Sequence, residues 1–374
     1  MRRLPTRRRF LATAAGAAAW SGLLRFFALP AAAMTKGGPV IGRADAATVQ
    51  TDTPGLRFFR IGTGTTAGTY FPIGGLIANA ISSPPGARPC DKGGSCGVPG
   101  LVAVAQATAG SVENLNLLMS GGVEAAMAQA DVAFAAYTGS GVFQGRAPFD
   151  RLRSIGTLYV EALHAVVRAE SDIFEPGDFR NHTVALGDEG SGTLVEARLA
   201  LAAYGVREAD LTPLYLQPGS GAERVASGEI DGFFIVGGAP VGAVSDLAER
   251  RLIRLVPFSG PEADRLRTQH RFLTATVIPE GVYPGVLATP TLGVGAELLV
   301  RADLPTDLIY GISRALWHEN TRRLLAEGHP KGKLIDPAHA AANVSVPLHP
   351  GAERYYREVG LVGNAANEAA PALR

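Results

Sequence analysis

Residues 58–81 read FFRIGTGTTAGTYFPIGGLIANAI, in which a short apolar strand leads to a loop of glycines and threonines and then to an apolar helix. The loop offers hydroxyls and backbone N–H groups and contains neither a lysine nor an acid. Unpaired N–H groups and the helix dipole at a helix N-terminus both favour negative charge. The segment therefore predicts a loop that holds a small anion and leaves it chemically unchanged.

A second unit of the same design lies near residue 190. There the strand-like TVALG leads to the loop DEGSGT and the helix LVEARLALAAYG, and both units continue with a further strand and helix. This alternation is typical of α/β folds with largely parallel strands. Ligands bind such sheets at the carboxyl ends of the strands. Two facing units would place two anion-holding loops on opposite sides of one small molecule.

The chain is expected to cross between the two units twice. Residues 155–167 read as a long apolar strand that leaves the first unit, and residues 286–299 could return the chain to it. This pattern predicts lobe one from residues 56–163 plus 288–374, and lobe two from residues 164–287.

Residues 1–46 predict a cleavable export signal and linker. The order Thr-Arg-Arg-Arg-Phe-Leu at residues 6–11 matches the bacterial twin-arginine signal, and an ordinary secretory signal is the alternative. Arg25 disfavours a retained membrane anchor, because a charge within an apolar span is costly. Cleavage after Ala33 or after Ala46 fits the small-residue rule, and either site would leave the mature chain in the periplasm.

The charge balance of the mature chain argues against nucleic-acid binding. Residues 1–46 contain eight of the 35 Lys and Arg residues and one of the 34 acids. Without them 27 basic and 33 acidic residues remain, a net charge of −6. A chain with that balance has no electrostatic reason to bind a polyanion.

The only two cysteines, Cys90 and Cys96, lie in a Pro/Gly-rich segment without a nearby histidine. Two thiols alone make a poor zinc site, so no metal is expected. In an oxidising compartment a disulfide is the expected state, and two reduced surface thiols are the alternative. Closing so short a loop contributes about 2 kcal/mol, so the bridge would hold a local excursion in place.

Five segments together resemble one family. They are GTGTTAGTYFPIGGLIANAI, CGVPGLVAVAQATAGSVENLN, MAQADVAFAAYTG, GDEGSGTLVEAR and VPLHPGAERYYREVG. The chain resembles, from about residue 58 to residue 361, the TAXI family of solute-binding subunits of tripartite ATP-independent periplasmic (TRAP-type) transporters.

The resemblance implies an α/β, two-lobed periplasmic binding protein fold of type II-like form, with the ligand in the cleft between the lobes. Such a protein is not an enzyme and needs no cofactor. It would bind a small anionic solute and pass it to TRAP membrane subunits driven by an ion gradient. Ligands attributed to the family are glutamate, glutamine and dicarboxylates such as 2-oxoglutarate. We expect a monomer.

The matched motifs imply a ligand site built from loops and helix starts. Its expected residues are Thr63, Gly64, Thr65, Thr66, Thr69, Tyr70, Gln129, Asp131, Glu161, Gly190, Ser191, Gly192, Thr193, Val236, Gly237 and Gly238. Asp131 or Glu161 would face a ligand ammonium, since a buried cation needs a partner. Alternatively, Asp131 caps its helix and Glu161 bridges the lobes or faces solvent. No arginine lies in these motifs, which is unusual for a site that binds two carboxylates.

Other functions have weaker support. The glycines of the first loop imitate a dinucleotide fingerprint, but the final spacing is off and no acid follows at the expected distance. A secreted enzyme would need a nucleophile beside a base, and no local arrangement suggests one. A sensor that presents its ligand to a membrane receptor is a further alternative. His164, in an apolar run, is expected to be a hydrogen-bonded core residue.

Overall fold

The computed structural model describes residues 55–362, so the predicted export signal lies outside the described residues. The strands are β1 (Arg57–Gly62), β2 (Ser82–Ser83), β3 (Val98–Pro99), β4 (Leu101–Gln106), β5 (Ala125–Gln129), β6 (Leu152–Arg168), β7 (Thr183–Ala185), β8 (Thr212–Leu214), β9 (Gly232–Gly237), β10 (Ile253–Leu255), β11 (Leu273–Ile278) and β12 (Thr289–Arg301). The helices are α1 (Tyr70–Ile81), α2 (Ser111–Ser120), α3 (Ala130–Thr138), α4 (Gly192–Ala203), α5 (Pro218–Ala226), α6 (Gly242–Glu249), α7 (Pro261–Gln269), α8 (Thr306–Leu316), α9 (Glu319–Gly328), α10 (Pro337–Ala340) and α11 (Pro350–Glu358).

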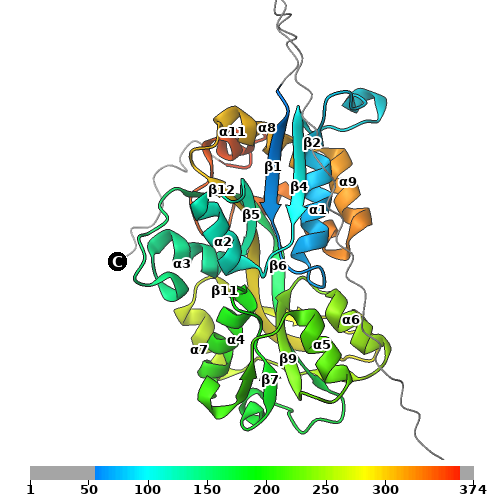
Figure 1. The fold of residues 1–374 in the computed structure, drawn as a ribbon, viewed down its shortest axis with the longest axis vertical. Helices are drawn as coiled ribbons and strands as arrows, with labels where there is room; N and C mark the ends of the chain where they lie inside the picture. The colour runs from blue at the N-terminus through cyan, green and yellow to red at the C-terminus, as the bar shows by residue number, and fades with distance from the viewer. Residues whose placement is uncertain (1–54, 363–374) are drawn as a thin grey trace, which may run out of the picture. The chain divides into compact units, whose positions relative to one another are not determined.

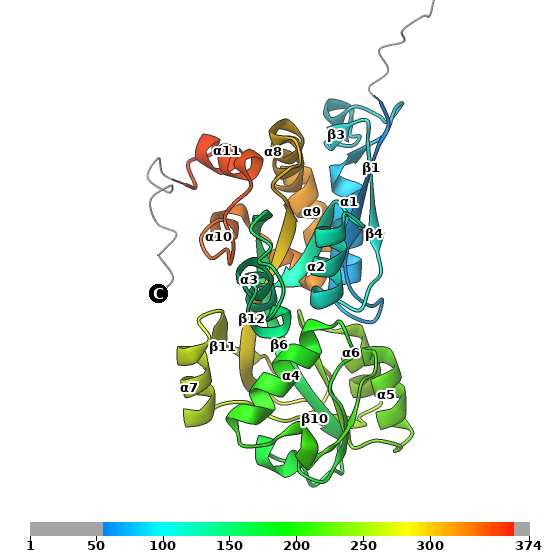
Figure 2. The same cartoon turned by 60° about the vertical axis from the view of Figure 1, so that its left-hand side comes forward.

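Lobe one is the group of elements built around β1, which pairs in parallel with β4 on one side and β5 on the other. Helices α1, α2, α3 and α8 to α11 belong to this lobe (Figure 1, with α10 labelled in Figure 2). Helix α1 forms because Ile73, Ile77 and Ile81 recur every four residues and are fully buried on one face. Helix α2 ends at Gly121, whose left-handed backbone conformation suits a glycine.

Lobe two is built around β7, which pairs in parallel with β8 and β9. Helices α4, α5, α6 and α7 belong to this lobe (Figure 2), and α4 and α5 pack against β9. Phe179, Phe234 and Phe258 pack together inside this lobe, with ring centroids 5.1 and 6.1 Å apart. Each lobe therefore has an apolar core of its own.

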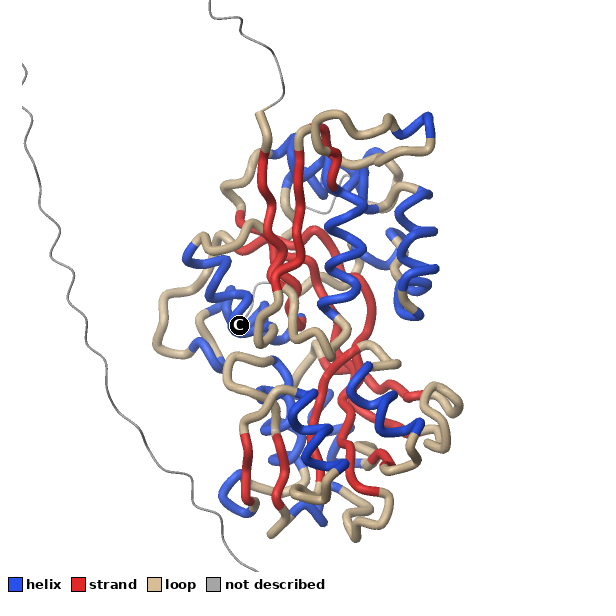
Figure 3. Tube along the Cα trace, turned by 45° about the vertical axis from the view of Figure 1, so that its right-hand side comes forward, coloured by secondary structure: helices blue, strands red, loops and turns tan. Residues whose placement is uncertain are grey.

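Two long strands, β6 and β12, run through both lobes and pair with each other in antiparallel orientation. Strand β12 pairs with β5 in lobe one and with β11 in lobe two, while the C-terminal half of β6 pairs with β9. All of these strands belong to one ten-stranded sheet, whose path through both lobes can be followed in Figure 3. The predicted crossings at 155–167 and 286–299 correspond to these two strands.

The predicted α/β fold with two lobes is confirmed. The predicted boundaries, 56–163 plus 288–374 for lobe one and 164–287 for lobe two, stay a proposal because β6 and β12 belong to both lobes. The predicted disulfide between Cys90 and Cys96 is present. Among the helices between residues 55 and 362, none combines the length and the apolar character that crossing a bilayer requires.

Candidate functional site

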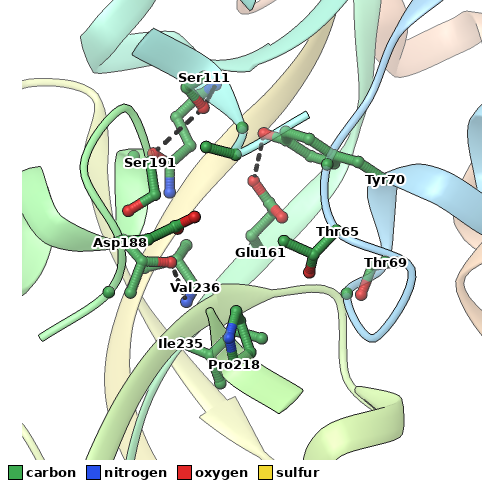
Figure 4. A pocket seen from close by; sticks show the side chains of 18 residues that line it. Thr65, Thr69, Tyr70, Ser111, Glu161, Asp188, Ser191, Pro218, Ile235 and Val236 are labelled. Carbon is green, nitrogen blue, oxygen red and sulfur yellow. Dashed lines mark hydrogen bonds between the residues drawn. The ribbon is translucent and has the colours of Figure 1, made fainter. Parts of the chain in front are cut away.

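Five helices of the two lobes begin around one cavity of about 50 Å³, which Figure 4 shows from close by. Its walls include the starts of α1, α2 and α3 from lobe one and of α4 and α5 from lobe two. The lining residues are Gly64, Thr65, Gly68, Thr69, Tyr70, Ala109, Gly110, Ser111, Gln129, Glu161, Gly187, Asp188, Ser191, Gly192, Thr193, Pro218, Ile235 and Val236. The volume is well below the ~300 Å³ at which drug-sized sites begin, so the cavity suits a small solute.

The first glycine–threonine loop reaches the cavity from the end of β1. Thr63 is buried beneath the loop, where its N–H and its hydroxyl both donate to the Gln106 carbonyl, at 2.9 and 2.7 Å. Gly64, Thr65, Thr69 and Tyr70 line the cavity, whereas Thr66 is exposed. Thr63 therefore supports the loop and does not face the cavity.

The second loop reaches the cavity at the start of α4. The Ser191 hydroxyl accepts a hydrogen bond from the Leu194 N–H at 3.0 Å, which caps the helix. The Thr193 hydroxyl accepts one from the Val236 N–H at 3.0 Å and so ties α4 to β9. Both hydroxyl hydrogens stay free to donate, because each oxygen acts only as an acceptor in these bonds.

Hydrogen bonds join the two lobes on both sides of the cavity. The Gly190 carbonyl of lobe two accepts the N–H groups of Val112 and Glu113 at the start of α2, both at 3.0 Å. On the other side of the cavity, the Thr69 hydroxyl donates to the Gly238 carbonyl at 3.0 Å. Gly190 and Gly238 therefore hold the lobes together and are not part of the cavity wall.

Glu161, at the middle of β6, is the buried acid of the cavity, with 2 % of its surface exposed. Its carboxylate accepts a 2.6 Å hydrogen bond from the Tyr70 hydroxyl. Burial raises the pKa of Glu161 to about 8, although this hydrogen bond and the nearby Lys331 ammonium lower it. Burial also raises the Tyr70 pKa well above its usual value, so the phenol remains a donor.

Asp188 lines the cavity from lobe two, opposite Glu161 (Figure 4). Burial raises the pKa of Asp188 to about 6, and its Oδ1 atom has no hydrogen-bond partner among residues 55–362. The described lining residues include no lysine, arginine or histidine. The cavity thus combines the positive ends of helix dipoles with two carboxyl groups.

The structure brings together most of the residues predicted from the motifs. Those that line the cavity are Gly64, Thr65, Thr69, Tyr70, Gln129, Glu161, Ser191, Gly192, Thr193 and Val236. Those that do not are Thr63, Thr66, Asp131, Gly190, Gly237 and Gly238. Asp131 lies in the first turn of α3, where a negative charge suits the helix dipole, but Gln129 occupies the cap position.

Several lining residues were not in the predicted set, namely Gly68, Ala109, Gly110, Ser111, Gly187, Asp188, Pro218 and Ile235. The helix starts among them carry a local signal, since Ser111 opens α2 and Pro218 opens α5. That signal shows where a helix starts in the sequence, but it does not show where this start lies in the folded protein.

One group of side chains in the described part of the chain has metal-ligand spacing, and it consists of Cys90, Cys96 and His318. The two sulfur atoms are bonded to each other, so neither is a thiolate. His318 Nδ1 accepts the Asn320 N–H at 3.1 Å, which leaves the proton of the neutral ring on Nε2, the atom facing Cys90. The group therefore does not fit a metal centre.

Comparison with known proteins gives a family and a set of similar structures. The NMT1-like family model matches residues 61–360. The periplasmic aliphatic sulphonate binding protein SsuA from Escherichia coli is 16% identical over 73% of this chain and 78% of that chain, with a TM-score of 0.40. The alkanesulfonate-binding protein SsuA from Xanthomonas axonopodis pv. citri, bound to MOPS, is 15% identical over 81% and 84%, also at 0.40. A mutant of ArgBP from T. maritima is 12% identical over 74% and 93%, again at 0.40.

Proposed function

The chain belongs to the NMT1-like family, and on that premise we propose that it is a periplasmic solute receptor of the TAXI type. In this proposal the two lobes close over a small carboxylate, and TRAP membrane subunits driven by an ion gradient take up the released solute. The protein binds its ligand and does not change it. The observation that carries the proposal is the cavity between two lobes at which five helices begin.

The helix starts suit the carboxylate of the ligand. The N-terminal ends of α1, α2 and α4 border this small volume, and the positive ends of their helix dipoles favour an anion there without a cationic side chain. The hydroxyls of Ser191 and Thr193 add hydrogen-bond donors. The closed lobes exclude water, which strengthens these polar contacts.

The two acids of the cavity favour an amino acid over a dicarboxylate. In a ligand that lacks an ammonium, the second carboxylate would approach Glu161 or Asp188 with no cation, on the ligand or on the described wall, to offset the repulsion. A ligand ammonium would instead pair with one of these acids. We therefore place L-glutamate and L-glutamine ahead of 2-oxoglutarate within the proposed ligand class.

The test is to identify the solute and then rank related solutes. Native mass spectrometry of the exported protein should reveal a small copurified acid. Calorimetry should then show tighter binding of L-glutamate or L-glutamine than of 2-oxoglutarate and succinate. If 2-oxoglutarate binds more tightly, the assignment of an amino acid is wrong. If no small carboxylate binds at all, the proposed function is wrong.

The transport partner needs a separate test. Vesicles that contain a TRAP membrane complex should accumulate the labelled solute only when the receptor and an ion gradient are both present. Accumulation that proceeds without the receptor, or without a gradient, contradicts the assignment of the partner.

A further inference from the structure

A second group of acids lies between the lobes, outside the solute cavity. Glu196 on α4 of lobe two is 2 % exposed, and neither of its carboxyl oxygens has a hydrogen-bond partner among residues 55–362. Asp131 on α3 of lobe one lies near it, and its buried Oδ1 atom has no partner in the same part of the chain. A buried carboxyl group without a partner, close to a second carboxyl group that is partly buried, cannot be charged together with its neighbour at low cost.

The surrounding charged groups do not neutralise this pair. From β6, Glu161 acts on Glu196, Tyr159 of the same strand lies near Glu161, and from α1 the Tyr70 hydroxyl donates to Glu161. Three cations and one histidine lie in this region, and each cation has another partner. Lys331 donates to the Val160 carbonyl, Arg198 pairs with Glu208, and Arg271 stacks on Phe134 and Phe272, with His270 beside it.

The pair depends on how the lobes meet. Asp131 and residues of α4 line the same groove, one wall from lobe one and the other from lobe two. Separating the lobes would return both carboxyl groups to water, where their pKa values are about 4. In the closed form, burial raises the pKa of Asp131 to about 6, and burial together with Asp131 raises that of Glu196 well above its usual value.

We propose that lobe closure takes up a proton, which Glu196 and Asp131 hold between them at the interface, so that acid favours the closed form and base opens it. The sign follows from proton linkage. The closed form binds more protons than the open form. The free energy that favours closure is therefore fully present below pH ~4 and is lost as the pH rises through the pKa values of the two acids in the closed form. One proton taken up on closure changes the solute dissociation constant about tenfold per pH unit within that range.

The decisive variant is Glu196→Gln, because it removes the charge and keeps the shape. Its matched control is Glu297→Gln, since Glu297 is also fully buried but lies within lobe one, where the Ser345 N–H donates to it at 2.7 Å. Small-angle scattering of the solute-free exported protein at pH 5 and pH 8 measures closure directly. We expect the wild type and Glu297→Gln to expand at pH 8, and Glu196→Gln to expand less than either.

Calorimetry provides a second measurement that involves the solute. With L-glutamate as the probe, in two buffers of different ionisation enthalpy, Glu196→Gln should take up about one proton per complex fewer than the wild type near pH 6.5. If Glu196→Gln does not fold, Asp131→Asn tests the same pair. This inference rests on the proposed function as a receptor that closes. The scattering measurement needs no ligand, so it tests the proton proposal even when L-glutamate does not bind.

Three results would overturn the proposal. The first is a wild type whose scattering is identical at pH 5 and pH 8. The second is a Glu196→Gln variant that keeps the pH response of the wild type. The third is closure at pH 8 that is restored by Na⁺ but not by K⁺, because a bound metal cation would then take the place assigned to the proton.

Discussion

The Tyr70 hydroxyl donates a 2.6 Å hydrogen bond to the Glu161 carboxylate, which links the first residue of α1 to the middle of β6. The bond fixes the direction of the one acid in the cavity that is almost fully buried. It also stabilises the charged form of Glu161 against the effect of burial. Because β6 runs through both lobes, the position of this carboxylate is coupled to the sheet that joins them.

We predict that Tyr70→Phe weakens solute binding by about 1–3 kcal/mol, because Glu161 loses its donor inside the cavity. The pKa of Glu161 should rise further, so the loss should be larger at pH 6 than at pH 9. Calorimetry with the copurified solute measures both effects. Tyr310→Phe is the control, since it removes an exposed Tyr–Glu hydrogen bond to Glu358, away from the cavity. Equal losses in the two variants would contradict the prediction.

Ser191→Ala and Thr193→Ala should each lower solute affinity, together by roughly 1–3 kcal/mol at about 0.5–1.5 kcal/mol per lost hydrogen bond. The structure adds a cost to the fold. The Ser191 hydroxyl caps α4, and loss of such a cap destabilises a protein by about 1 kcal/mol. Thermal unfolding and calorimetry should therefore both change. Ser120→Ala, on the exposed end of α2, is the control and should change neither. Unchanged affinity in the double variant would reject both residues as ligand contacts.

We expect the buried acid Glu297 to cause part of the pH dependence of the protein's stability. Burial raises its folded-state pKa to about 7. The contribution of Glu297 to the free energy of unfolding is therefore fully present below pH ~4 and is lost as the pH rises through 7. We expect the wild type to lose on the order of 2 kcal/mol at this site between pH 5 and pH 8.

Glu297→Gln should remove that part of the slope, because the amide is neutral and the hydroxyls of Ser154 and Ser345 lie beside it. Denaturant unfolding at several pH values measures the slope. The exposed substitution Glu319→Gln should leave it unchanged. A Glu297→Gln variant with the full wild-type slope would show that this carboxyl does not titrate on unfolding.

The sequence was sufficient to predict the elements that surround the cavity, because their signals are local. Glycine and hydroxyl residues between an apolar strand and an apolar helix indicate the loop before α1 and the loop before α4. This signal does not depend on which residues of other elements pack against the loops. His164 was also predictable: it is fully buried between the Ala162 carbonyl, 2.9 Å from Nδ1, and the Tyr283 hydroxyl, 2.9 Å from Nε2.

Contacts between the lobes were not predictable in the same way. Gly110 and Ser111 reach the cavity because lobe one places α2 beside the start of α4, and no local spacing encodes that approach. Asp131 follows Gln129 by two residues, so it lies on another side of the helix start and faces the lobe interface instead of the cavity. Which side of a helix start meets a neighbour is decided by the packing of whole elements.

The close approach of Gly192 to lobe one gives the last prediction. A Cβ atom at this position would overlap the amide oxygen of Gln129 and lie 2.8 Å from the Ser111 hydroxyl, both on the other lobe. Gln129 is itself buried and has little room to move. Gly192→Ala should therefore hinder closure and weaken solute binding at least tenfold, while the separate lobes keep their structure.

Gly75→Ala, a helical position with no atom within 4 Å of the new Cβ, is the matched control. It should leave affinity unchanged and slightly raise the unfolding temperature, because alanine loses less backbone entropy than glycine on folding. A Gly192→Ala variant that binds as well as Gly75→Ala would show that the two lobes need not meet at this point to hold the solute.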